Sequence, residues 1–167
     1  MLELAILTIF PAAVVFAGAM DLFTMTIPNR ISLALLAGFL VLAPFAGFGP
    51  WEMAQHFVAG LVVLVVGVLL FIPGWIGGGD AKLAAAAALW LGFENLFAYF
   101  FFTALAGAVL AIVFMKVRAT PLPAVVCTQA WAVRLHDRRT GMPYGIALAG
   151  GALLIYPHTA WFTGLAG

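Results

Sequence analysis

The chain has 167 residues, a length typical of one domain. Apolar residues make up 66% of it and charged residues 8%, against roughly 45–50% and about 25% in soluble globular domains. So few charges cannot cover a soluble globule or form the basic face of a nucleic-acid binder, and both classes are excluded. The one cysteine, Cys127, excludes a disulfide framework and a CxxC zinc site. The composition indicates an integral membrane protein.

Six apolar segments follow one another along the chain, and we expect each to form a helix that crosses the membrane. Proline, glycine or charged residues interrupt the apolar sequence between them, as is typical of turns. The fourth segment is short for a span, because a membrane helix needs about 20 residues. The predicted fold is therefore an all-α polytopic membrane protein in a single domain, 1–167. The spans run roughly over 4–23, 32–49, 56–73, 81–93, 95–115 and 144–165.

The basic residues predict how these helices are oriented. All seven fall in the connections after the first, third and fifth spans, which lie on one side of the membrane. Because positively charged loops stay in the cytosol, we expect both termini outside. The segment 116–143 carries five of the seven, and we expect it to rest on anionic lipid at the cytosolic interface.

Two aspartates, Asp21 and Asp80, stand at the predicted cytosolic ends of their spans. A carboxyl group at membrane depth is costly, so a function is the first hypothesis for each. Structural alternatives remain open. Asp80 would be the N-cap of the fourth span, accepting from the amides of Lys82 or Leu83, and Asp21 would pair with Arg30 at the interface.

Two carboxyl groups within reach of one another carry out general acid–base chemistry. One activates a water molecule while the other donates a proton to a carbonyl oxygen or a leaving amine. A close pair shares a proton because two like charges repel. Since Asp80 begins a helix and Asp21 lies near the end of one, the helix dipoles favour Asp80 as the base and Asp21 as the acid.

Three motifs occur in a fixed order around these aspartates. Asp21 is followed by Pro28-Asn29, Asp80 closes Gly77-Gly78-Gly79-Asp80 with Lys82 after it, and Pro143-Tyr144-Gly145 opens the last span. Together they resemble the type IV prepilin peptidase family, the GxGD aspartic membrane proteases. The resemblance covers residues 15–150, nearly the whole chain.

The resemblance implies that the protein cleaves the leader of prepilin or pseudopilin substrates on the cytosolic side of the bacterial inner membrane. The substrate enters from the bilayer, and Asp21 and Asp80 are the implied catalytic pair. The small size is similar to that of peptidases from tight-adherence (Flp-type) pilus systems. Archaeal preflagellin peptidases are similar too. Larger members also N-methylate the product, and no methyltransferase activity is expected here. No metal or other cofactor is expected.

Further residues of these motifs are candidates for shaping the site, each with a simpler alternative. The three glycines before Asp80 bring the chain close to a substrate or form a flexible turn. Lys82 favours the ionised form of Asp80 or binds a lipid phosphate. Two motifs lie further from Asp80 in sequence. Asn29 bonds within the site or, as we favour, caps the second span, and Pro143-Tyr144-Gly145 borders the site or merely starts a helix.

Other functions are tested against the same sequence. Ser32 is the only serine and lies outside a GxS motif, and the three histidines do not form HExxH, so serine and zinc membrane proteases are disfavoured. Two alternatives stay open: a small proton-linked transporter subunit that uses Asp21 and Asp80 as a relay, and a structural subunit in which both are caps.

Overall fold

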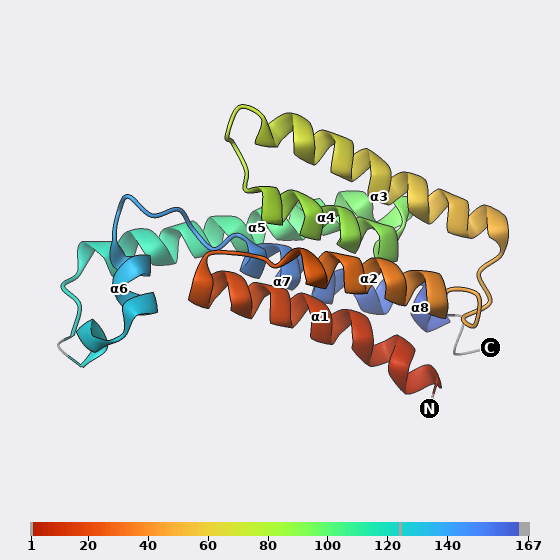
Figure 1. Ribbon diagram of the computed structural model, residues 1–167, viewed down its shortest axis with the longest axis horizontal. Coiled ribbons are helices and arrows are strands. Elements are labelled where there is room, and N and C mark those ends of the chain that lie inside the picture. Colours follow the sequence, from red (N-terminus) through yellow and green to blue (C-terminus); the bar gives the residue numbers. More distant parts are fainter. Residues whose placement is uncertain (1, 124, 164–167) are drawn as a thin grey trace.

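A computed structural model describes residues 2–123 and 125–163, and this part of the chain is helical with no strand. Six helices alternate in direction along the long axis of the molecule (Figure 1). They are α1 (Leu2–Thr24), α2 (Asn29–Leu42), α3 (Pro50–Phe71), α4 (Gly78–Leu91), α5 (Phe93–Ala119) and α7 (Gly145–Ile155). Four short helices complete the structure: η1 (Val126–Thr128), α6 (Ala130–His136), η2 (Tyr156–His158) and α8 (Ala160–Thr163).

The helices confirm an all-α polytopic membrane protein, although they differ in length. Within the described residues three are long and apolar enough to cross a membrane: Leu4–Thr24, Pro50–Phe71 and Phe93–Ala119. The apolar helices over 29–42 and 145–158 are shorter. The other predicted spans thus correspond to helices of 14 residues or fewer between turns.

Helix α4, the short fourth segment, lies at the centre of the bundle. It contacts α1, α2, α3, α5 and α7, and the side chains from Leu83 to Leu91 are all buried. Small residues permit this contact, because a Cβ on Gly67 of α3 would lie 2.9 Å from the Cβ of Ala81. A helix surrounded by protein need not match the thickness of the bilayer, which explains its length.

Aromatic side chains close the end of the bundle near α8. Trp90 and Trp161 are fully buried and stack with ring centroids 4.6 Å apart. Their indole N–H groups donate to the carbonyl oxygens of Leu35 and Trp90, and the Tyr156 hydroxyl donates to that of Ile6. Each polar atom named here has a partner, and the rings are tightly packed.

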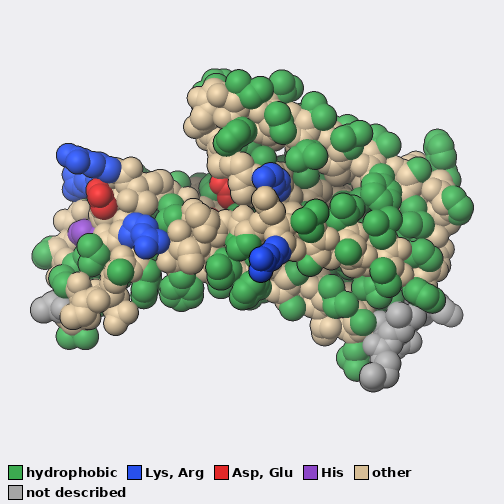
Figure 2. Space-filling view, viewed as in Figure 1, with side chains coloured by type: hydrophobic (Ala, Val, Ile, Leu, Met, Phe, Trp, Pro, Cys, Tyr) green, Lys and Arg blue, Asp and Glu red, His purple; other side chains and the backbone are tan. Residues whose placement is uncertain are grey.

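We call the opposite half of the molecule, from the starts of α2 and α4 to α6, the basic end, because it holds all seven Lys and Arg. The basic side chains visible in Figure 2 lie toward α6 and near the beginnings of α2 and α4. Helix α6 is held there by Arg118, whose guanidinium donates to the carbonyls of Leu135 and Gly141. Trp131 packs edge-on against Phe23 of α1. The segment 116–143 thus packs against the basic end. The basic residues are Arg30, Lys82, Lys116, Arg118, Arg134, Arg138 and Arg139.

Candidate active site

Asp21 lies one turn before the end of α1 and is buried, with 6% of its surface exposed. Its Oδ2 accepts a hydrogen bond of 2.7 Å from the backbone N–H of Gly145, 124 positions later in the chain. Gly145 is the first residue of α7, where backbone N–H groups have no partner within their own helix. Asp21 therefore provides the hydrogen-bond acceptor for the first N–H of α7. The predicted alternative of an ion pair with Arg30 is wrong.

Asp80 is the third residue of α4 and is partly buried. The N-cap of the helix is Gly77, with no side-chain capping bond, so the alternative that Asp80 is an N-cap is wrong. The carboxylate lies beside the backbone amide of Gly77 and within electrostatic range of Asp21. Both carboxylates thus face the start of a helix. Helix dipoles therefore no longer distinguish an acid from a base, because Asp21 lies near the end of α1 but also faces the start of α7.

The three glycines before Asp80 each make room for a different group. A Cβ on Gly77 would lie 2.8 Å from Oδ2 of Asp80, and one on Gly78 would lie 3.3 Å from the Phe71 ring. A Cβ on Gly79 would lie 3.1 Å from the Cβ of Ile27. The absence of side chains therefore lets the carboxylate fold back over the helix start and lets α4 approach the α1–α2 connection closely.

Ile27 lies between the start of α4, which carries Asp80, and the start of α7, which contacts Asp21. Its side chain contacts Gly79 at the start of α4, and a Cβ on Gly145 would lie 3.0 Å from its Cδ1. The same Cβ on Gly145 would lie 2.9 Å from both Cβ and Oδ2 of Asp21. The starts of α4 and α7 and the end of α1 thus meet around one half-buried apolar side chain. Ile27 lies within the Asp21 to Asn29 motif, but nothing in the sequence indicates this role for an apolar side chain.

Tyr144 stands on the α5 side of the pair. Its ring packs directly on Gly107, where a Cβ would lie 2.6 Å from Cε2 and 2.9 Å from the hydroxyl oxygen. It lies within electrostatic range of Asp80. Pro143, which precedes it, is buried and leads the chain into α7. Nothing in the sequence around Gly107 indicates Tyr144 as its partner.

Tyr99 and Thr103 of α5 lie behind Tyr144 and are buried, with at most 2% of their surface exposed. Tyr99 is within electrostatic range of both Tyr144 and Asp80. Thr103 packs against Gly151 of α7. Neither residue is indicated by the sequence, since one tyrosine and one threonine in an apolar helix carry no motif.

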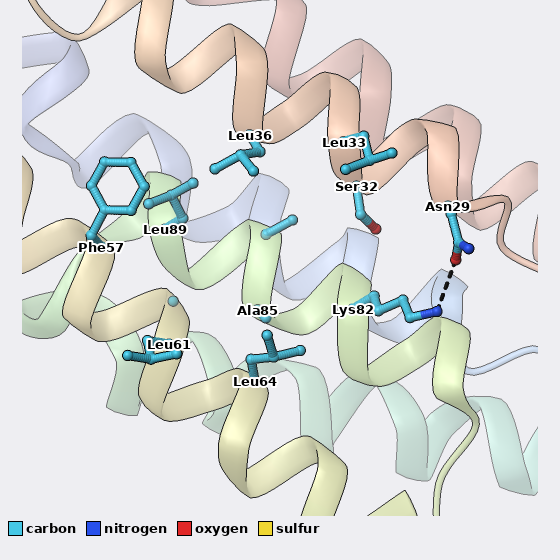
Figure 3. A pocket seen from close by; sticks show the side chains of 12 residues that line it. Asn29, Ser32, Leu33, Leu36, Phe57, Leu61, Leu64, Lys82, Ala85 and Leu89 are labelled. Carbon is cyan, nitrogen blue, oxygen red and sulfur yellow. Dashed lines mark hydrogen bonds between the residues drawn. The ribbon is translucent and has the colours of Figure 1, made fainter.

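Lys82 and Asn29 are placed together, but not with the carboxyl pair. The Lys82 amine donates to the Asn29 side-chain oxygen at 2.9 Å (Figure 3). Pro28 is the N-cap of α2, with no side-chain capping bond, so the favoured prediction that Asn29 caps this helix is wrong. Asp80 and Lys82 are two positions apart on a helix, which separates them by about 160° around its axis. The structure therefore groups the motif residues as one carboxyl site with the Lys82–Asn29 bond beside it.

Two carboxyl groups and a nearby tyrosine provide proton donors and acceptors at the basic end. Asp21 is fixed by a backbone amide and Asp80 by its place at the helix start. Among the described residues no group of three His, Cys, Asp or Glu side chains lies close enough to hold a metal ion. The arrangement is suited to general acid–base chemistry by the carboxyl pair.

Comparison with known proteins identifies the family of this chain. The model of the type IV leader peptidase family matches residues 8–112, which include both aspartates but not Tyr144 or Gly145. The prepilin leader peptidase/N-methyltransferase of Bacillus subtilis (strain 168) is 30% identical over 158 residues. That alignment covers 93% of this chain and 56% of the relative, so the chain spans little more than half the length of that protein. No solved structure matches the chain. The chain belongs to the type IV leader peptidase family.

Proposed function

We propose that the protein is an aspartic endopeptidase of the membrane that removes the leader from type IV prepilin-like substrates, with Asp21 and Asp80 as its catalytic pair. One observation carries the proposal. Two carboxylates that are far apart in sequence lie within electrostatic range of each other at the junction of α1, α4 and α7. The family to which the chain belongs supports the substrate class.

The chemistry follows from two carboxyl groups that share a proton. The ionised member takes a proton from a water molecule, and the water oxygen bonds to the scissile carbonyl carbon. The protonated member donates its proton to the carbonyl oxygen. Collapse of the tetrahedral intermediate breaks the C–N bond, and the first carboxyl gives the proton that it took from water to the leaving amine. The second carboxylate takes a proton back from a hydroxyl of the intermediate as the C=O bond re-forms. Both carboxyls end the cycle in their starting protonation states.

The side of the membrane follows from the charges. The carboxyl pair lies at the basic end, while Glu52 and Glu94 begin α3 and α5 at the other end. By the positive-inside rule we expect the basic end to face the cytosol, which supports our proposal that cleavage occurs on the cytosolic side of the bacterial inner membrane. A substrate helix entering from the bilayer would then present its leader there. We further propose an Flp-type substrate and no methyltransferase activity.

Cys127 offers a direct test of this orientation. It is the only cysteine, it is exposed, and it lies between α5 and α6 at the basic end. A maleimide that cannot cross membranes is expected to label it in inverted inner-membrane vesicles and not in intact spheroplasts. Cys127→Ser is the control for labelling of other groups. Labelling in spheroplasts would contradict the proposed orientation.

The catalytic proposal is tested by co-expressing prepilins with the wild type, Asp21→Asn, Asp80→Asn and Asp137→Asn. Asp137 is the matched control, because its carboxylate accepts from the backbone N–H of Arg139 in an exposed turn away from the pair. Loss of general acid–base catalysis lowers rates by about 10²–10⁴-fold. We expect loss of that size for the first two variants, each inserted normally, and wild-type cleavage for the third.

Other results would contradict the proposal. Cleavage by Asp21→Asn or Asp80→Asn at the rate of Asp137→Asn would show that the pair is structural. The substrate class would be contradicted if the wild type left a panel of prepilins intact while the Bacillus subtilis relative cleaved them. The transporter alternative would be favoured if the wild type cleaved no prepilin but carried protons into vesicles, and if either substitution abolished that proton flux.

A further inference from the structure

A groove lies between α2 and α3, with α4 as its floor (Figure 3). Its volume is about 490 Å³, within the range of roughly 300–1,000 Å³ typical of ligand sites. Apolar side chains form its walls and alanines its floor. The walls and floor include Leu36, Phe57, Leu61, Leu64, Ala85 and Ala86.

Polar groups are confined to the end of this groove nearest the basic end. Lys82 and Asn29 meet there in their 2.9 Å hydrogen bond. That bond uses one ammonium proton and the amide oxygen, so two ammonium protons and both amide protons remain as donors. No carboxylate of the described chain pairs with Lys82. The entrance is therefore a cationic cluster of donors without a counter-ion.

Ser32 adds a third donor slightly further along the groove. Its hydroxyl oxygen is buried and has no hydrogen-bond partner among the described residues. In Figure 3 this oxygen points toward the space between α2 and α4. A buried hydroxyl without a partner is unfavourable, and an acceptor bound in the groove would provide that partner. The groove thus has donors at one end only and apolar walls beyond them.

This groove is separate from the carboxyl pair. Lys82, Ala85, Ala86 and Leu89 line it and share one face of α4. Asp80 does not line it and lies on the opposite face of the helix, toward Asp21. A ligand in the groove would therefore leave the carboxylates uncovered.

We infer that the groove binds an anionic phospholipid, with the phosphate on Lys82 and Asn29 and one acyl chain along α4. The polarity of the groove matches such an amphiphile, because a single cationic end continues into an entirely apolar channel. The ester carbonyl of the lipid is the acceptor for Ser32. Charge decides the class of lipid, since a basic pocket between membrane helices selects an anionic headgroup over a zwitterionic one.

Native mass spectrometry of the full chain in detergent tests this assignment. Phosphatidylglycerol and phosphatidylcholine of equal chain length are titrated against the wild type, Lys82→Gln and Leu64→Trp. One basic residue at a membrane surface contributes about fivefold in affinity. We expect the wild type to bind phosphatidylglycerol at least about fivefold more tightly than phosphatidylcholine. We expect Lys82→Gln to bind the two lipids equally.

Leu64→Trp fills the groove and is expected to reduce retention of both lipids. Two substitutions outside the groove are matched controls: Lys116→Gln removes a charge from the end of α5, and Leu105→Trp adds the same bulk at an exposed position of that helix. Both are expected to bind lipid as the wild type does. Thermal unfolding in detergent checks that each variant is folded.

Three results would overturn the inference. Equal binding of the two lipids by the wild type would remove the headgroup site. An equal effect of Lys82→Gln and Lys116→Gln would show general surface attraction instead of a pocket. If one prepilin transmembrane peptide displaced one bound phosphatidylglycerol, the groove would be assigned to the substrate. None of these depends on whether Asp21 and Asp80 are catalytic, so the two proposals fail separately.

Discussion

The contact between Gly145 and Asp21 predicts that Gly145→Ala abolishes most activity while the protein remains folded. The added Cβ would lie 2.9 Å from Cβ and from Oδ2 of Asp21. Carbon atoms in contact prefer about 3.5–4.0 Å, so Asp21 or the start of α7 must move by roughly 0.6–1.1 Å. The 2.7 Å hydrogen bond from the Gly145 N–H is stretched by this movement.

The magnitude follows from two separate effects. Inserting a methyl group into a packed site costs about 1–3 kcal/mol of unfolding free energy. A misplacement of about 1 Å in a catalytic group lowers the rate by about 100-fold. We therefore expect cleavage to fall about 100-fold, with a moderately lower unfolding temperature and normal membrane insertion.

Gly150→Ala is the matched control for this substitution. Gly150 lies in the same helix, and a Cβ there meets no atom within 4 Å. Replacing glycine by alanine within a helix stabilises it by about 0.5–1 kcal/mol, so this variant is expected to be at least as stable as the wild type and as active. The assay is leader cleavage in membranes, with thermal unfolding in detergent. Equal cleavage by the two variants would refute the argument that the Gly145 contact positions Asp21.

Two further predictions concern positions that the motifs do not indicate. Gly107→Ala places a Cβ 2.6 Å from the Tyr144 ring. We expect slower cleavage and a lower unfolding temperature, because the added methyl group reduces the free energy of unfolding by about 1–3 kcal/mol. Cleavage at the wild-type rate would show that Tyr144 is not required in this position. Trp90→Phe removes the fully buried indole and its 2.9 Å bond to the Leu35 carbonyl. It is expected to destabilise the protein by about 1–3 kcal/mol while cleavage at low temperature persists, and an unchanged unfolding temperature would contradict the role of the aromatic end.

Gly145 and Lys82 illustrate what a sequence motif does and does not reveal about a site. The sequence predicted Gly145 as part of a motif at the start of the last span, and the structure shows it directly against Asp21. The same reasoning grouped Lys82 with Asp80, because the two are close in sequence. Helical geometry instead turns Lys82 toward α2 and the groove. Proximity along a chain does not identify a shared site when the residues are two positions apart on a helix.

Composition and the order of residues determined the class of this protein. So few charges in an apolar chain leave only a membrane protein, and the distribution of Lys and Arg determined which helix ends lie together. Asp21 and Asp80 stood out because carboxylates are rare and costly in apolar helices. Those inferences need only the identity of the residues and their distance from a turn.

Only the tertiary structure decided which faces of the helices meet. In a soluble helix the polar face reveals the buried one, but in an apolar helix the residues that face lipid and those that face protein are equally apolar. The pattern therefore could not show that α4 is enclosed by five other helices, that Ile27 lies between the starts of α4 and α7, or that Gly107 makes room for Tyr144. Those contacts are set by close packing of small residues between helices, because shape rather than hydrophobicity distinguishes one apolar face from another.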